Sequence, residues 1–217
     1  MPHLKRTLLA LAAFVALGFG ATEARADSVI VGNATGTQAT ATVTNVSLVN
    51  NIFTFTLTNT SPFDARITGV GFDLPPIGNA SPDGLNGFTG TSSNANFTFR
   101  DTGLGNVPQF NTAVLDFGFT TGNSGNFNGG SPNDGLAPGQ SATFSITGPF
   151  AGFSAAQIEA SIFVRFQRVG ANGEGSDVGR PTTPTNPIPE PTTMLLLGTG
   201  LAGIAGVVRR RKANQAG

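Results

Sequence analysis

Few of the side chains that commonly perform catalysis occur in this chain of 217 residues. Its single histidine is His3, it has no cysteine, tyrosine or tryptophan, and no lysine lies between Lys5 and Lys212. The stretch between residues 27 and 187 therefore cannot hold a Ser-His-Asp triad, a Cys-His pair, a Ser-Lys dyad or a histidine- or thiolate-bound metal. We expect no enzymatic activity and no cofactor.

Carboxylates are the main reactive groups that remain. Between residues 27 and 187 ten acidic side chains stand against five arginines, which gives a net charge of −5. Glycoside hydrolysis uses two carboxylates that flank the sugar, but such clefts usually stack the sugar on tryptophan or tyrosine, which are absent here. Nucleic acid is not an expected partner, because phosphate binding needs clustered lysine and arginine.

Two further site chemistries stay open. Asn133–Gly135, Ser81–Asp83 and Glu174–Asp177 offer hard oxygen ligands for calcium, but these residue types also form turns by bonding their own backbone, and we favour the turns. Arg165 and Arg168 could pair with Glu174 and Asp177. Five asparagines occupy Asn-x-Ser/Thr sequons, in which glycosylation is an alternative to simple richness in Asn and Thr: Asn33, Asn45, Asn59, Asn79 and Asn96.

The elements that must position these residues are expected to be strands. Phe53, Phe55 and Leu57 alternate with threonines, a period of two that buries one face of a strand. Asn50-Asn51 precedes that strand and predicts a two-residue hairpin turn. The other expected strands are Ser28–Val31, Ala41–Val49, Ala65–Leu74, Asn94–Arg100, Thr112–Phe119, Ala142–Gly148 and Ala160–Val169. Ser154–Ile158 predicts one helical turn that Ser154 caps.

These short strands, separated by Gly and Pro, predict an all-β fold. We expect an antiparallel β-sandwich, of jelly-roll or Ig-like type, over residues 27–169. Sixteen phenylalanines between Phe53 and Phe166 supply one core. The hydrophobic content falls after Val169, so residues 170–187, rich in Gly, Pro and Thr, are predicted to form a linker.

The N-terminus has the pattern of a secretory signal peptide over residues 1–26. Lys5 and Arg6 precede an apolar run from Thr7 to Gly20, and Ala24 and Ala26 supply the small-x-small cleavage pattern. Signal peptidase and the general secretion machinery are therefore expected partners. The alternative, a permanent N-terminal anchor, is disfavoured because the run is short and a cleavage pattern follows it.

Residues 188–217 combine three features in order. Pro189, Glu190 and Pro191 precede an apolar run that ends at Val208, and the basic residues Arg209, Arg210, Arg211 and Lys212 follow it. The 17 residues from Thr192 to Val208 would extend about 25 Å as a helix, near the lower limit for one membrane span. The basic cluster predicts a cytoplasmic C-terminus. The small residues in this run leave three interpretations open. The helix could pack closely against another helix, it could be weak enough for an enzyme to unwind and cut, or it could be a plain membrane anchor.

This order of features resembles the PEP-CTERM sorting signal of exopolysaccharide-producing Gram-negative bacteria. The resemblance rests on Pro189-Glu190-Pro191, the Leu-Leu-Leu-Gly-x-Gly-Leu-Ala-Gly run from Leu195 and the Arg-Arg-Arg-Lys tail, with Ile188 where valine is common. It implies that exosortase, a polytopic membrane protease or transpeptidase, recognises and processes this segment.

The body of the chain resembles the cistern family of such proteins. The similar stretches are Leu57-Thr-Asn-Thr-Ser-Pro with Arg66-Ile-Thr-Gly-Val-Gly-Phe-Asp, and Val164-Arg-Phe-Gln with Gly173-Glu-Gly-Ser-Asp. The biochemical activity of that family is not established, so this resemblance adds no function to the prediction.

Together these features predict an exported, non-enzymatic protein of the cell surface or extracellular matrix, associated with exopolysaccharide or biofilm. During sorting it would be a transient or permanent single-pass inner-membrane protein with its C-terminus in the cytoplasm. The alternative is a glycan- or surface-binding module, with or without calcium, that is simply anchored in the membrane.

Overall fold

The computed structural model describes residues 27–32, 38–75, 87–108, 110, 113–123, 125–170 and 172–182. They belong to one compact unit, residues 27–185. The predicted signal peptide with Ala24 and Ala26, and the predicted sorting segment 188–217 with Pro189–Pro191 and Arg209–Lys212, lie outside the described residues. Within the described part of the chain, no helix is long and apolar enough to cross a membrane.

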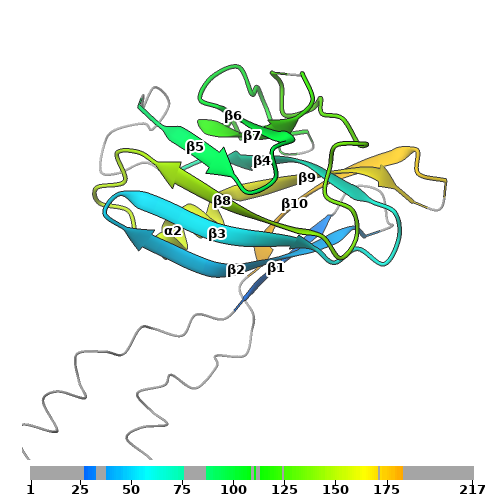
Figure 1. Ribbon diagram of the computed structural model, residues 1–217, viewed down its shortest axis with the longest axis horizontal. Coiled ribbons are helices and arrows are strands. Elements are labelled where there is room, and N and C mark those ends of the chain that lie inside the picture. The colour runs from blue at the N-terminus through cyan, green and yellow to red at the C-terminus, as the bar shows by residue number, and fades with distance from the viewer. Residues whose placement is uncertain are drawn as a thin grey trace, which may run out of the picture. The chain divides into compact units, whose positions relative to one another are not determined.

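Ten strands and one short helix make up the described fold (Figure 1). The strands are β1 Ser28–Gly32, β2 Thr40–Val49, β3 Ile52–Asn59, β4 Arg66–Phe72, β5 Thr89–Ser92, β6 Phe97–Arg100, β7 Phe117–Thr121, β8 Ser141–Thr147, β9 Ile162–Val169 and β10 Gly175–Thr182, and the helix is α2 Ala155–Ala160. They form a single ten-stranded sheet in the order β5-β8-β3-β2-β1-β10-β9-β4-β7-β6. All of the strand pairs are antiparallel.

The sheet curls until its two edge strands, β5 and β6, approach each other. A Cβ added to Gly90 of β5 would collide with the ring of Phe99 on β6, so glycine permits this close approach. The ring of Phe97 on β6 lies 5.3 Å from that of Phe144 on β8. The fold is thus all-β, antiparallel and barrel-like, which confirms the predicted class. The finer prediction of a two-sheet sandwich is not confirmed by this continuous pairing.

Phenylalanines fill the interior because successive strand residues point to opposite faces. Phe53, Phe55 and Leu57 of β3 are fully buried, and Phe55 stacks on Phe144 with ring centroids 5.2 Å apart. A second, smaller cluster lies on the opposite face of β9 and β10, where loop residues cover it: Leu104, Val107, Ala113, Leu115, Phe127, Phe163 and Val178.

Several local predictions are confirmed. Asn50 and Asn51 have φ of 52° and 60° and join β2 to β3, as a two-residue hairpin requires. Ser154 caps α2 in a capping box with Gln157.

Other predicted bounds differ from the structure. β7 begins five residues later than the predicted strand start at Thr112, and β6 begins three residues after Asn94. β5 was not predicted.

The predicted linker over residues 170–187 is wrong for Gly175–Thr182, which form β10 between β1 and β9. Val178 and Asp177 are fully buried, and the Asp177 carboxylate occupies the space that a Cβ at Gly32 would need. β9 pairs with β10 only as far as Gly179, so Pro181 stands where β10 has a strand partner on one side only, a position that tolerates proline. The folded domain therefore extends to Thr182, beyond the predicted boundary at Val169.

Candidate functional site

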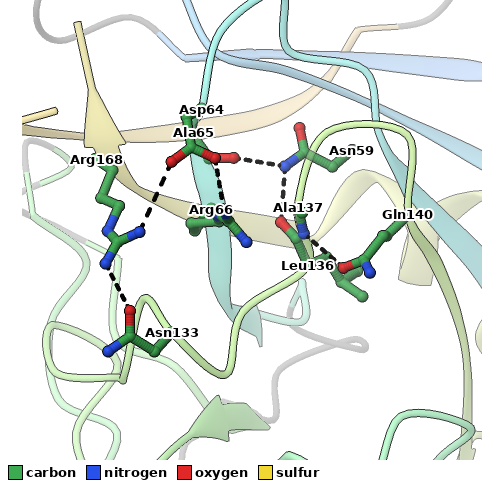
Figure 2. Close-up of polar contacts among 9 residues, drawn as sticks. All are labelled: Asn59, Asp64, Ala65, Arg66, Asn133, Leu136, Ala137, Gln140 and Arg168. Atoms are coloured by element: carbon green, nitrogen blue, oxygen red, sulfur yellow. Dashed lines mark hydrogen bonds and ion pairs between the residues drawn. The ribbon is translucent and has the colours of Figure 1, made fainter.

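A polar cluster lies where the start of β4, the end of β9 and the loop before β8 meet (Figure 2). Asp64 Oδ1 is 2.6 Å from Arg66 Nη2, and Asp64 Oδ2 is 3.7 Å from Arg168 Nη1. Arg168 Nη2 donates a hydrogen bond of 2.6 Å to Asn133 Oδ1. We call these four residues the Arg168 cluster. It joins segments that are far apart in the sequence.

Backbone geometry places Arg168 in this cluster. Its φ is 56°, a left-handed value that costs an L-residue about 1–2 kcal/mol. The pairing of β9 with β10 shifts register here, since Val169 pairs with Gly175 and Gln167 pairs with Ser176. Such a bulge re-aims a side chain, and Arg168 reaches Asp64. The predicted pairing of Arg168 with Glu174 or Asp177 is therefore wrong.

Asn59, at the end of β3, lies beside the cluster. Its side chain links the segment before β4 to the loop before β8 (Figure 2). Its Nδ2 donates to Ala65 O and to Leu136 O, each at 2.8 Å, and its Oδ1 accepts from Ser61 N at 3.1 Å. Leu136 also exchanges two backbone hydrogen bonds with Ile67 of β4. One fully buried side chain thus ties three chain segments together.

Arg165 of β9 is also buried, with 8% of its surface exposed. Because side chains alternate along a strand, its side chain is on the face of β9 that also carries Phe163, whereas Ile162, Val164 and Phe166 face the main core. Burial lowers the pKa of the Arg165 guanidinium, and the negative charge of Asp177 partly offsets this effect. Arginine nevertheless stays protonated near neutral pH, so Arg165 is a positive charge held among packed residues.

The predicted oxygen-rich loops have structural partners where they are described. Asn133 Oδ1 accepts from Arg168 and Asp134 O accepts from Asn96 Nδ2, while Asp177 is buried and accepts from Val178 N at 3.1 Å. Residues 81–83 lie outside the described residues. In the described ranges, no group of three or more His, Cys, Asp or Glu could hold a metal ion.

The five predicted sequons fall into three groups. Asn45 and Asn96 are exposed, and Asn33 and Asn79 lie outside the described ranges. Asn59 is fully buried and donates two hydrogen bonds, so it cannot accept a glycan in the folded state. Sequence reasoning treated all five alike because the sequon carries no information on burial.

The Arg168 cluster offers little chemistry beyond fastening loops. Asp64 is 63% exposed and Arg168 is 37% exposed, so both are solvated, and no nucleophile joins them in the cluster. Exposed ion pairs of this kind contribute typically under about 1 kcal/mol. We interpret the cluster and Asn59 as contacts that hold the loop between β7 and β8 against the start of β4 and the end of β9.

The C-terminal residues match a known protein-sorting motif. Residues 187–212 match the family model described as the PEP-CTERM protein-sorting motif. No curated protein and no solved structure matched the chain. The match contains Pro189, Glu190, Pro191 and the basic residues Arg209–Lys212, and it confirms the resemblance that these residues suggested. The similarity to the cistern family stays a prediction.

Proposed function

We propose that this chain is an exported, non-enzymatic protein of the cell surface or extracellular matrix that exosortase sorts and processes at its C-terminus. The observation that carries the proposal is the PEP-CTERM match at residues 187–212. Such a motif implies export, membrane anchoring for sorting and exosortase as the sorting partner. Association with exopolysaccharide or biofilm follows from the setting in which these signals operate.

The proposed route has two processing steps. Signal peptidase cuts after Ala26, so the exported chain begins at Asp27. The apolar run before Arg209 then holds the chain in the inner membrane, with the basic tail in the cytoplasm. Exosortase finally acts near Pro189-Glu190-Pro191, after which the domain reaches the cell surface or the extracellular space.

The extent of the folded domain supports processing at this point. β10 ends at Thr182, and six residues separate it from Pro189. A cut near the Pro-Glu-Pro sequence therefore leaves every described strand in place, whereas a cut within the expected linker at residues 175–182 would remove a strand that pairs on both sides.

The residue content supports a non-enzymatic role. Residues 27–187 contain no histidine, cysteine, lysine, tyrosine or tryptophan, which leaves only hydroxyls and carboxylates among the usual nucleophiles and bases. Among the described residues, the side chains of the Arg168 cluster bond to one another, and the Asn59 side chain bonds to backbone groups of neighbouring loops. These bonds are of the kind that stabilise a fold.

A second candidate is a glycan- or surface-binding module that remains simply anchored in the membrane, with or without calcium. Uncharged hydroxyl side chains aligned across β2, β3 and β8 favour a binding role. Binding and sorting are compatible, so the two candidates differ in whether the C-terminus is processed.

The deciding experiment is the intact mass of the protein from its native host. We expect a species that begins at Asp27 and ends near Pro191, and a species that ends at Gly217 when the exosortase gene is deleted. Glu190→Ala should block processing, and the matched variant Ile188→Val should be processed normally because it changes one methylene. A mature protein that ends at Gly217 in the unaltered host would contradict the proposal and favour the anchored module.

A further inference from the structure

Hydroxyl side chains line the outward face of four neighbouring strands. β2, β3, β8 and β5 are adjacent in the sheet, and their inward residues, such as Phe55 and Phe144, fill the core. The outward positions of β3 are Thr54, Thr56 and Thr58, all partly exposed. In Figure 1, β2 and β3 are blue to cyan, and β8 is the neighbour of β3 on the other side.

The strand register aligns these hydroxyls into rows. The rows are Thr42–Thr58–Ser141, Thr44–Thr56–Thr143 and Ser47–Thr54–Ser145–Thr91. Neighbouring strands lie about 4.8 Å apart, and outward residues along one strand lie about 6.8 Å apart. We call these ten residues the hydroxyl face. A bulge between Thr44 and Ser47 in β2 restores the alternation, so that Ser47 again points outward opposite Thr54.

The hydroxyls of β3 already bond to those of β8. The oxygen–oxygen distances are 3.4 Å for Thr54–Ser145, 3.2 Å for Thr56–Thr143 and 2.8 Å for Thr58–Ser141. A hydroxyl has one donor and two acceptor lone pairs. Each pair therefore keeps one O–H donor and three lone pairs available outward. The orientation of each side chain is also fixed in advance, which lowers the entropic cost of binding a ligand.

The absence of charge on this face indicates which kind of partner it can bind. None of the four strands contains a charged residue. A polyanion would find no cation here and a polycation no carboxylate, while an apolar partner would strip the hydroxyls of water without replacing their hydrogen bonds. A neutral polyhydroxylated polymer both donates and accepts, as the face does.

We propose that the hydroxyl face binds a neutral polysaccharide chain that lies across β2, β3 and β8. Two exposed aliphatic residues border the face at the hairpin end, Val49 at 61% exposure and Ile52 at 40%, and they offer apolar surface to the C–H groups of a sugar. The chain has no tryptophan or tyrosine to stack on sugar rings. Affinity for one short oligosaccharide is therefore weak, and a polymer binds through repeated contacts.

This inference deepens the proposed function, because only an exported protein meets such a polymer, but its test does not depend on sorting. The full chain, purified in detergent, is run by affinity electrophoresis through gels that contain hydroxyethyl cellulose, dextran or alginate. We expect retardation by at least one neutral polymer and none by alginate, which is a polyanion. Stronger retardation by alginate, or none by either neutral polymer, would overturn the proposal.

A set of variants assigns the binding to the face. Thr54→Val/Thr56→Val/Thr143→Val removes three hydroxyls while it keeps β-branched side chains that suit strands, and we expect affinity to fall about tenfold or more. The corresponding triple serine variant keeps the hydroxyls and should bind as the unaltered chain does. Thr98→Val/Thr102→Val, at exposed positions outside the face, is the matched control.

Thermal unfolding by circular dichroism verifies that each variant is folded. A folded valine variant with unchanged retardation would refute the assignment. If the neutral polymers do not retard the protein but its C-terminus is processed, the sorting proposal stands and the binding proposal falls. If the polymers retard it but the C-terminus is not processed, the binding proposal stands and the sorting proposal falls.

Discussion

Asn59 is the residue on which the loop arrangement depends most directly. Asn59→Ala would leave the carbonyl of Ala65 and the N–H of Ser61 without their side-chain partner in a buried setting, whereas the Leu136 carbonyl would keep its bond from Ile67 N. Each unsatisfied buried group costs about 1–3 kcal/mol, so we expect a loss of at least about 2 kcal/mol in the free energy of unfolding. Urea denaturation at equilibrium measures it.

The control for this prediction is Asn96→Ala. Asn96 is exposed and donates one side-chain hydrogen bond, to Asp134 O at 3.2 Å, so water can replace the lost partner. We expect a change under about 0.5 kcal/mol, as for most surface substitutions. Equal losses for Asn59→Ala and Asn96→Ala would show that the buried bonds of Asn59 are not important for stability.

Arg168 allows backbone strain to be separated from its ion pair. Arg168→Ala loses the contacts with Asp64 and Asn133 and keeps the strained φ of 56°. Arg168→Gly loses the same contacts but relieves about 1 kcal/mol of strain. We therefore expect the glycine variant to be more stable than the alanine variant by about 1 kcal/mol, which reverses the usual order in strands. The midpoints of urea unfolding compare the two. If alanine equals or exceeds glycine, Arg168 is not strained.

At the scale of elements, the β2–β3 hairpin depends on two left-handed asparagines. Asn51→Gly keeps the positive φ of 60° without strain and should be neutral or slightly stabilising. Asn51→Ala should lose about 1 kcal/mol, because alanine has no local side-chain bond to offset a left-handed backbone. Differential scanning calorimetry can resolve the two effects.

The control for the hairpin is Asn128→Ala. Asn128 is exposed and is not among the residues with positive φ, so its replacement should change the midpoint little. An Asn51→Ala variant as stable as the Asn128→Ala variant would mean that the turn conformation does not limit the stability of the hairpin.

At the scale of the whole molecule, β10 completes the sheet. A chain that stops after Gly170 lacks β10 and leaves edges of β1 and β9 without a partner, and open edges promote aggregation. We expect it to be insoluble or to lack a cooperative unfolding transition. A chain that stops after Pro187 keeps β10 and should unfold cooperatively. Light scattering and thermal circular dichroism test both, and a stable fold for the shorter chain would show that residues 170–187 form a linker after all.

The position of β10 also relates folding to processing. β10 pairs with β1, the first strand of the exported chain, with Val29 opposite Thr182. The first and last strands of the domain are therefore hydrogen-bonded neighbours, and the sheet can close only after residue 182 has crossed the membrane. Six residues separate β10 from Pro189, so the proposed processing site lies outside the closed sheet.

Local signals in the sequence determined the class of the fold and several of its parts. The two-residue alternation in β3, the Asn50-Asn51 turn, the Ser154 cap and the C-terminal sorting signal each involve neighbouring residues, so no knowledge of distant contacts was needed. Composition removed most catalytic chemistry for the same reason, because an absent residue type is absent in any fold.

Only the tertiary structure decided which distant residues meet. Gly175–Thr182 is too polar and too rich in Gly and Pro to predict a strand, and it became one because β1 and β9 offer hydrogen bonds on both sides. Arg168 pairs with Asp64 across the fold because a bulge turns it there. The threonines of β3 were visible as an alternation, but their rows with β2 and β8 depend on strand register. Register is set by long-range pairing and core packing, which neighbouring residues alone do not specify.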